Sequence, residues 1–158
     1  MPEDKDMDMP ANNIIQLPGD ETVQLDFGDG DDDMTELPMI NTFDIDGVIF
    51  MGDEFTGVWP GPSDIIITGR SLTQAGETFD MLHERGIFNP VMFNPLDRFD
   101  PIYSREESGK HKGRTLRQLL ESYHIGIHFE DDPIQISQIE SFKLGINIVH
   151  LQHTLTVK

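Results

Sequence analysis

Hydrophobic and polar positions alternate with two different periods between residues 39 and 151, and the two periods predict strands and helices in turn. Short runs of apolar and β-branched residues are typical of strands, whereas apolar residues three and four positions apart indicate the buried face of a helix. The apolar runs predict strands at 40–46, 64–68, 91–93, 126–130 and 146–151. The helical spacing predicts helices at 71–85, 113–123 and 134–142.

The order of these segments predicts the fold class. The run at 64–68 (DIIIT) is continuous and β-branched, as in a strand that is buried on both faces of a sheet. Strands that alternate with helices form parallel sheets with right-handed crossovers, and the helices then cover the sheet. The sequence therefore predicts an α/β fold with about five mostly parallel strands flanked by helices, in a domain at 39–158.

The first 38 residues have a different character. Residues 1–38 contain 12 aspartates and glutamates and a single lysine, so they hold −11 of the formal net charge of −18. Such a segment repels itself and has little apolar surface to bury, which predicts a mostly disordered acidic tail. Residues 13–27 contain two strand-like runs around a Pro-Gly turn; the alternatives are disorder and a hairpin that docks on the domain or on a partner. The aspartates at 29–33 lack the Asp-x-Asp-x-Asp-Gly spacing of a calcium loop, which favours a charged linker.

Composition and charge exclude several classes of protein. The chain has no cysteine, which excludes disulfide scaffolds, zinc sites with thiolate ligands and cysteine nucleophiles. A net charge of −18 argues against a protein that coats nucleic acid with a basic surface, although the acidic tail suits a basic partner. No apolar run approaches the ~18 residues of a membrane span, and the N-terminus is acidic, unlike a signal peptide. We therefore expect a cytoplasmic protein that does not bind membranes.

Polar and charged residues collect where three of the predicted strands end. In parallel α/β sheets these carboxyl ends lie at one edge, where ligands bind. Acidic side chains that meet there would repel one another unless a divalent cation neutralised them, and oxygen ligands suit Mg²⁺. The three ends carry Asp44-Ile45-Asp46-Gly47, Thr68-Gly69-Arg70 and Glu130-Asp131-Asp132, and the basic cluster Lys110-His111-Lys112 lies between the last two in sequence.

Two aspartates that are two residues apart can divide the work of a hydrolase. In an extended segment Asp44 and Asp46 lie on the same face, and Gly47 lets the chain turn sharply after them. One carboxylate can attack an electrophile while the other transfers a proton. The hydroxyl of Thr68 can hold a phosphoryl oxygen, and a nearby lysine can offset the charge that develops during phosphoryl transfer.

In chain order, these segments resemble the four motifs of the haloacid dehalogenase-like hydrolases, a family with a Rossmann-like fold. The resemblance covers about residues 40–151 and rests on Phe43–Val48, Ile66–Arg70, Lys112 and Phe129–Asp132. It implies that Asp44 is the nucleophile that forms an aspartyl-phosphate, and that Asp46 is the general acid and base. It also implies that Thr68 and Lys112 hold the phosphoryl group, with Lys110 as the alternative to Lys112.

The resemblance further implies a Mg²⁺ site. Its ligands would be Asp44, the backbone carbonyl of Asp46, Asp132 and the neighbouring Asp131. A different interpretation of Asp132 is a helix cap, because aspartate before proline is common at the start of a helix. A plain turn is the alternative for Thr68-Gly69.

The spacing of the motifs leaves no room for an inserted cap domain. Only 21 residues separate Asp46 from Thr68 and 43 separate Thr68 from Lys112, so the resemblance implies a capless enzyme with an open site. Trp59, in the short insertion, either packs under a rigid loop or stacks on a base at the mouth of the site.

A closer resemblance bears on the substrate. Residues 68–70, 104–110 and 129–136 resemble the 3′-phosphatase module of phage polynucleotide kinase-phosphatases, which implies that Gly69, Arg70 and Arg105 bind the substrate and that the protein works in a bacterial or phage-infected cell. The predicted function is a Mg²⁺-dependent phosphomonoesterase, a hydrolase that acts on nucleic-acid 3′ ends or nucleotides. The alternatives are a phosphatase for small metabolites or deoxynucleotides, and a non-catalytic interaction protein that uses the acidic tail.

Overall fold

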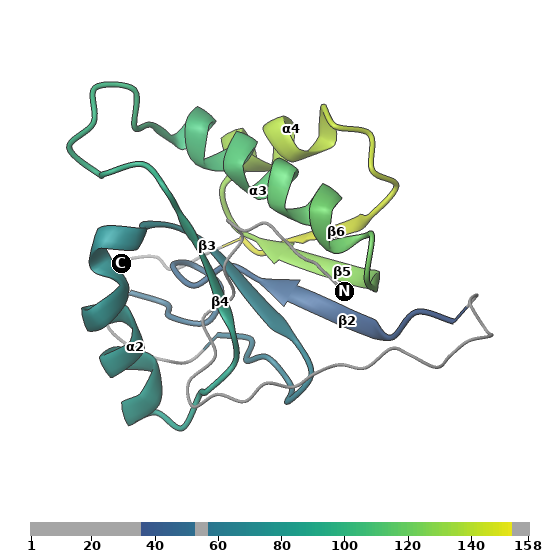
Figure 1. Cartoon of the computed structure of the whole chain (residues 1–158), viewed down its shortest axis with the longest axis horizontal. Coiled ribbons are helices and arrows are strands. Elements are labelled where there is room, and N and C mark those ends of the chain that lie inside the picture. Colours follow the sequence, from purple (N-terminus) through teal and green to yellow (C-terminus); the bar gives the residue numbers. More distant parts are fainter. Residues whose placement is uncertain (1–35, 53–56, 153–158) are drawn as a thin grey trace, which may run out of the picture.

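The computed structural model describes residues 36–52 and 57–152, and they form a single five-stranded sheet with helices packed against it (Figure 1). Every strand pairing in the sheet is parallel, and the strand order is β4-β3-β2-β5-β6. The predicted α/β, Rossmann-like fold class is therefore confirmed. The strands are β2 (Met39–Phe43), β3 (Ile65–Ser71), β4 (Val91–Asn94), β5 (His124–Glu130) and β6 (Asn147–His150).

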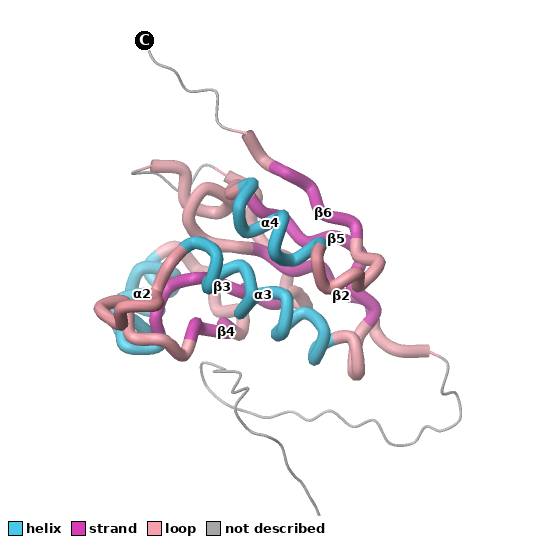
Figure 2. Tube along the Cα trace, turned by 90° about the horizontal axis from the view of Figure 1, so that it is seen from above, coloured by secondary structure: helices cyan, strands magenta, loops and turns pink. Residues whose placement is uncertain are grey.

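The helices cover the two faces of the sheet. They are the 3₁₀ turn η1 (Leu72–Gln74), α2 (Ala75–Glu84), α3 (Arg105–Leu119) and α4 (Pro133–Glu140). Helices α3 and α4 pack side by side on one face, whereas α2 covers the other (Figures 1 and 2). Among the described helices, none combines the length and the apolar character that a bilayer span requires.

The alternation of side chains along β3 explains the continuous apolar run at 64–68. Ile66 packs into the core on the α2 side, whereas Ile65 and Ile67 pack into the core under α3 and α4. Successive strand residues point to opposite faces, so a strand that is buried on both sides needs apolar residues at every position. The two cores are thus separated by the sheet.

Helix α3 differs most from its prediction. It begins at Arg105, eight residues before the predicted helix at 113–123, because the Ser104 side chain caps it by accepting a hydrogen bond from the Glu107 N–H. The first part of this helix was not predicted because it contains Gly109 and Gly113, and glycine has a low helix propensity. Both glycines allow α3 to approach the segment after β5: a Cβ at Gly109 would lie 2.9 Å from Gln135 Cα, and one at Gly113 would overlap the Phe142 ring.

The loop after β2 takes the place of a cap domain. Gly47 has a φ of 84°, which favours glycine, and the Ile45 carbonyl accepts hydrogen bonds from the N–H groups of Val48, Ile49 and Phe50. The chain then folds back, with the Val58 N–H bonded to the Val48 carbonyl at 2.8 Å. Within the described part of 44–64 no cap domain is inserted. The predicted hairpin at 13–27, and almost all of the predicted tail at 1–38, lie outside the described residues.

The topology places a ligand site at the end of β2. From β2 the chain moves to β3 and β4, and then crosses back to β5 on the other side of β2. Helices leave the sheet in opposite directions on the two sides of such a reversal, which opens a crevice at the carboxyl ends of the strands. Asp44, the residue after β2, lies at this reversal.

Candidate functional site

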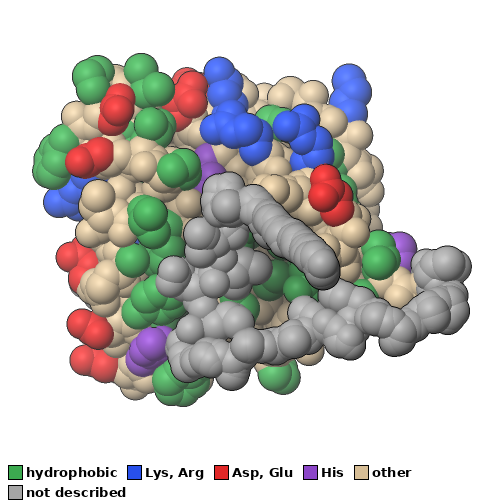
Figure 3. Space-filling view, viewed as in Figure 1, with side chains coloured by type: hydrophobic (Ala, Val, Ile, Leu, Met, Phe, Trp, Pro, Cys, Tyr) green, Lys and Arg blue, Asp and Glu red, His purple; other side chains and the backbone are tan. Residues whose placement is uncertain are grey.

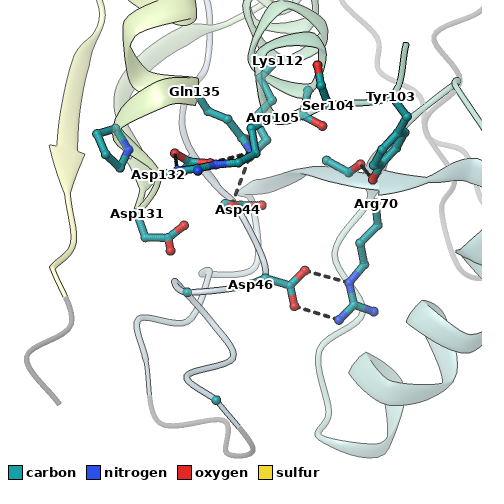
Figure 4. Close-up of a pocket in the computed structure, with 15 residues that line it drawn as sticks. Asp44, Asp46, Arg70, Tyr103, Ser104, Arg105, Lys112, Asp131, Asp132 and Gln135 are labelled. Carbon is teal, nitrogen blue, oxygen red and sulfur yellow. Dashed lines mark hydrogen bonds and ion pairs between the residues drawn. The ribbon is translucent and has the colours of Figure 1, made fainter. Parts of the chain in front are cut away.

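A cleft of about 640 Å³ lies at the carboxyl edge of the sheet (Figure 4). All of the residues predicted to form the site line this cleft, except Thr68. They come from the ends of β2, β3 and β5 and from α3. The predicted residues that line it are Asp44, Asp46, Gly69, Arg70, Arg105, Lys112, Asp131 and Asp132.

At the base of the cleft, one buried lysine is shared by two carboxylates. Lys112 Nζ lies 3.1 Å from Asp44 Oδ2 and 2.9 Å from Glu130 Oε1. The side chains of Lys112 and Glu130 are fully buried, and that of Asp44 is 7% exposed. Lys112 lies in the interior of α3 rather than ahead of a helix as predicted, and Lys110 points elsewhere, to Glu107 at 3.4 Å. The structure thus brings Lys112, and not Lys110, to Asp44.

Because Lys112 is shared with Glu130, its charge does not offset the effect of burial on the pKa of Asp44. Burial alone would lower the pKa of Lys112, but the two carboxylates outweigh it and raise that pKa above its ordinary value. Burial also favours the neutral form of Glu130, but Lys112 and His128 lower the pKa of this carboxyl. Burial, followed by the charge of Glu130, raises the pKa of Asp44 well above its usual value. Asp44 is therefore the carboxyl that a further cation would stabilise most in its ionised form.

Glu130 is held in place by a buried histidine. His128 Nε2 lies 3.0 Å from Glu130 Oε1, and His128 Nδ1 lies 2.8 Å from Thr42 Oγ1. An ionised carboxylate can only accept, so His128 Nε2 donates to it, and Nδ1 of the neutral ring accepts from the Thr42 hydroxyl. Burial lowers the pKa of His128, in agreement with a neutral ring. Thr42, His128 and Glu130 are fully buried.

Three carboxylates converge at the cleft. Oxygens of Asp44, Glu130 and Asp131 lie within 4.8 Å of one another, and such a group can hold a metal ion. Gly47 makes the approach of Asp131 possible, because a Cβ at this position would overlap the Asp131 carboxylate. Glu130 Oε2 is buried and has no hydrogen-bond partner among the described residues. Glu130 was not predicted as a ligand, since the run of acids at 130–132 does not reveal which of them the strand end carries to Asp44.

Asp46 and Asp132 do not belong to this group, and each is held by an arginine (Figure 4). Arg70 donates from Nε to Asp46 Oδ2 at 2.9 Å and from Nη2 to Asp46 Oδ1 at 2.8 Å. These hydrogen bonds raise the pKa of Arg70 above its ordinary value. Arg105 donates in the same way to Asp132, at 2.8 and 2.7 Å, and lowers the pKa of that carboxyl. Asp132 also caps α4 by accepting the Ile134 N–H at 2.9 Å, so the predicted alternative of a helix cap is present.

The strand β3 carries the second predicted motif. Thr68, Gly69 and Arg70 lie within β3, where the pairing with β4 shifts register between Ile67 and Ser71, rather than in a plain turn. Thr68 is fully buried, and its Oγ1 accepts the Arg70 N–H at 3.0 Å.

Two further residues of the cleft, Tyr103 and Ser108, were given no role from the sequence. The Tyr103 hydroxyl donates to the Gly69 carbonyl at 2.7 Å. Ser108 packs closely against Gly69, since a Cβ at Gly69 would lie only 3.0 Å from Ser108 Oγ. Trp59 is 43% exposed and is not among the described residues that line the cleft.

Comparisons with known proteins place the fold. No protein-family model matches the sequence, and no curated protein matches it. A chain in the structure of the Pnkp1/Rnl/Hen1 complex is similar, with a TM-score of 0.55 and 14% identity over 84% of this chain and 58% of that chain. The fold is shared. A chain in the Pnkp1/Rnl/Hen1 RNA repair complex matches with a TM-score of 0.51 and 14% identity, over 78% of this chain and 45% of that one. This protein therefore spans about half the length of these chains, and at such identity the similarity establishes the fold alone.

Proposed function

We propose that this protein is a Mg²⁺-dependent phosphomonoesterase that forms an aspartyl-phosphate on Asp44 and acts on nucleic-acid ends or nucleotides. The observation that carries the proposal is the buried pairing of Asp44 and Glu130 with Lys112, beside Asp131, at the reversal of strand order. A buried carboxylate next to a buried lysine suits nucleophilic attack on a phosphate, because the lysine stabilises the charge on the phosphoryl oxygens.

The carboxylates fit a magnesium ion. Asp44, Glu130 and Asp131 would hold it, since Mg²⁺ prefers carboxylate oxygens and Glu130 Oε2 lacks a hydrogen-bond partner among the described residues. The backbone carbonyl of Asp46 stays a predicted further ligand. When bound, the ion would supply the positive charge that keeps Asp44 ionised and that attracts the phosphate oxygens.

In the proposed reaction, a carboxylate oxygen of Asp44 attacks phosphorus, and the bond between phosphorus and the leaving alcohol breaks. Once Arg70 has moved to the phosphate, Asp46 takes up a proton from water, and it passes this proton to the leaving oxygen. Asp46 then removes a proton from a water molecule, which attacks the aspartyl-phosphate and releases inorganic phosphate and the free Asp44 carboxylate.

The ion pair of Asp46 with Arg70 has a role in this scheme. Both Asp46 oxygens accept hydrogen bonds from Arg70. The same two N–H groups of Arg70 can instead bind two phosphate oxygens, because guanidinium matches carboxylate and phosphate in the same fork geometry. Substrate binding would thus draw Arg70 to the phosphate and free Asp46 for proton transfer. Arg105, whose side chain is 60% exposed, can exchange Asp132 for phosphate in the same way.

Phosphate release from a panel of substrates tests the proposal. The panel comprises para-nitrophenyl phosphate, deoxynucleotides and a 3′-phosphorylated oligonucleotide, each with Mg²⁺ and with a chelator. We expect Mg²⁺-dependent release that is abolished in Asp44→Asn, because an amide keeps the size of the carboxylate but cannot attack phosphorus. Release by Asp44→Asn above about a tenth of the wild-type rate would exclude Asp44 as the nucleophile. Turnover of small phosphates without the oligonucleotide would favour a metabolite phosphatase.

A further inference from the structure

Residues 95–104 are the loop that connects β4 to α3, and with Asn94 at the end of β4 they form a repeated local structure. Figure 1 shows the loop standing out from the edge of the sheet where the strands end, next to the start of α3. The side chains of Asn94, Asp97 and Asp100 each accept the backbone N–H two residues ahead, at 3.0, 2.9 and 3.0 Å. The residues whose N–H groups are held in this way are Leu96, Phe99 and Ile102. Three successive turns of this type fix the direction of the loop.

The loop is also tied to the cleft. The Asp100 N–H bonds to the Asp97 carbonyl at 2.8 Å, and the Tyr103 N–H bonds to the Asp100 carbonyl at 2.9 Å, so consecutive turns are joined. The hydroxyl of Tyr103, which lines the cleft, donates to the Gly69 carbonyl in β3. The loop therefore stands beside the cleft in a defined conformation.

This conformation leaves two large apolar side chains exposed. Phe99 is 80% exposed and Ile102 is 56% exposed. The guanidinium carbon of Arg98 lies 5.0 Å from the centre of the Phe99 ring. Hydrophobic side chains gather at the upper left of the molecule, over this loop (Figure 3). Apolar side chains that are held out beside a ligand cleft are typical of a binding surface.

We propose that Phe99, with Arg98 beside its ring, is a stacking platform for the nucleobase of a substrate whose phosphate enters the cleft. This inference rests on the proposed function. A base is flat and uncharged, so it can stack on the ring without repulsion from the acidic residues of the loop, Asp97 and Asp100. These two carboxylates are occupied by the turns of the loop itself. The terminal phosphate is charged, and Arg70, Arg105 and Lys112 provide positive charge for it in the cleft.

A comparison of two substrates tests the platform. Para-nitrophenyl phosphate has no base, whereas a 3′-phosphorylated oligonucleotide has one next to the phosphate. Phe99→Leu keeps an apolar side chain but removes the aromatic face, and Phe99→Tyr keeps that face. We expect Phe99→Leu to lower the ratio of kcat/KM on the oligonucleotide to that on para-nitrophenyl phosphate by about tenfold, mainly through KM, and Phe99→Tyr to restore it. Phe88, 57% exposed and ahead of β4, is the matched control, and Phe88→Leu should leave the ratio unchanged.

A binding measurement separates this inference from the proposed function. An oligonucleotide with 2-aminopurine next to its 3′-phosphate should lose fluorescence on binding the Asp44→Asn protein, because stacking on an aromatic ring quenches it. Phe99→Leu in that background should weaken binding and remove most of the quench. If the wild type releases phosphate from both substrates but Phe99→Leu leaves the ratio and the quench unchanged, the platform is wrong and the phosphatase is not. If no substrate is hydrolysed but the quench depends on Phe99, the platform stands and the proposed reaction fails. A greater loss on a phosphopeptide than on the oligonucleotide would overturn the choice of a base.

Discussion

Lys112 Nζ lies 3.1 Å from Asp44 Oδ2, with the lysine fully buried and the aspartate nearly so. The same nitrogen lies 2.9 Å from Glu130 Oε1, so one cation serves two carboxylates. A buried charge that loses its partner is far more costly than an exposed one, because water cannot replace the partner. The geometry at Lys112 therefore links the stability of the fold to the chemistry proposed for the cleft.

Lys112→Met should destabilise the protein by about 3–5 kcal/mol, the range for breaking a buried ion pair. Urea unfolding monitored by circular dichroism measures this free energy. Lys110→Met is the matched control, since the Lys110 side chain is 45% exposed and its ion pair with Glu107 is worth at most about 1 kcal/mol. Equal stability of the two variants would contradict the burial of Lys112. Adding Glu130→Gln to Lys112→Met should recover part of the loss, because one of the unpaired charges is then removed.

The proposed metal site includes Asp131 but not Asp132. Mg²⁺ at 100 times its Kd should stabilise the wild type by about 2.7 kcal/mol through mass action, seen as a rise in Tm. Asp131→Asn should abolish this rise, because Asp131 belongs to the three converging carboxylates. Asp132→Ala should keep it, while the loss of the α4 cap lowers stability by about 1 kcal/mol. The opposite result, with the rise lost only in Asp132→Ala, would restore the ligand set predicted from the sequence.

Thr42→Val tests the hydrogen bonds that hold Glu130. The change keeps the shape of the side chain but leaves His128 Nδ1 buried without a donor, which should cost about 1–3 kcal/mol. Because the His128 ring that orients Glu130 is then less firmly held, Mg²⁺ affinity measured by calorimetry should fall about 10- to 100-fold. Thr115→Val is the control: Thr115 contacts His111 Nδ1 at 3.4 Å, apart from the three carboxylates. Unchanged Mg²⁺ affinity in Thr42→Val would show that the position of Glu130 does not depend on the hydrogen bond between Thr42 and His128.

His111 should make the protein sensitive to acid. Burial, with the charges of Lys112 and Arg114, lowers the pKa of His111 to about 4. The unfolded chain therefore binds a proton near pH 6.5 that the folded protein does not bind until about pH 4. The stability from this group is complete above pH 6.5 and is lost as the pH falls, by about 2 kcal/mol at pH 5 and about 3 kcal/mol at pH 4. The buried His128 acts in the same direction.

The measurement is the free energy of urea unfolding between pH 7.5 and pH 4.5. His111→Gln should reduce the loss of stability over this range, even if the variant is less stable at pH 7.5. His124, exposed at the start of β5, is the matched control. A pH dependence that is the same in the wild type and in His111→Gln would show that His111 is not buried as a neutral ring.

The sequence by itself determined the fold class and the edge of the sheet that forms the site. Each strand could be predicted from a local run of apolar residues, and the run Ile65–Ile67 reflects the burial of β3 on both faces. Parallel strands place their carboxyl ends at one edge, so the residues after β2 and those at the ends of β3 and β5 had to meet there. Asp44, Arg70 and the acids at 130–132 were found in this way.

Only the tertiary structure decided which of these side chains touch. The start of α3 could not be predicted because Gly109 and Gly113 lower the helix propensity of this segment. The two glycines allow close contact with residues more than 20 positions away in the sequence. The choice of Lys112 over Lys110 depends on which side of α3 faces the sheet. Glu130 and Asp131 converge with Asp44, and Asp132 does not, because of where β5 ends and α4 begins. Such contacts depend on the packing of segments that are distant in the sequence, so a local pattern of hydrophobic and polar residues cannot predict them.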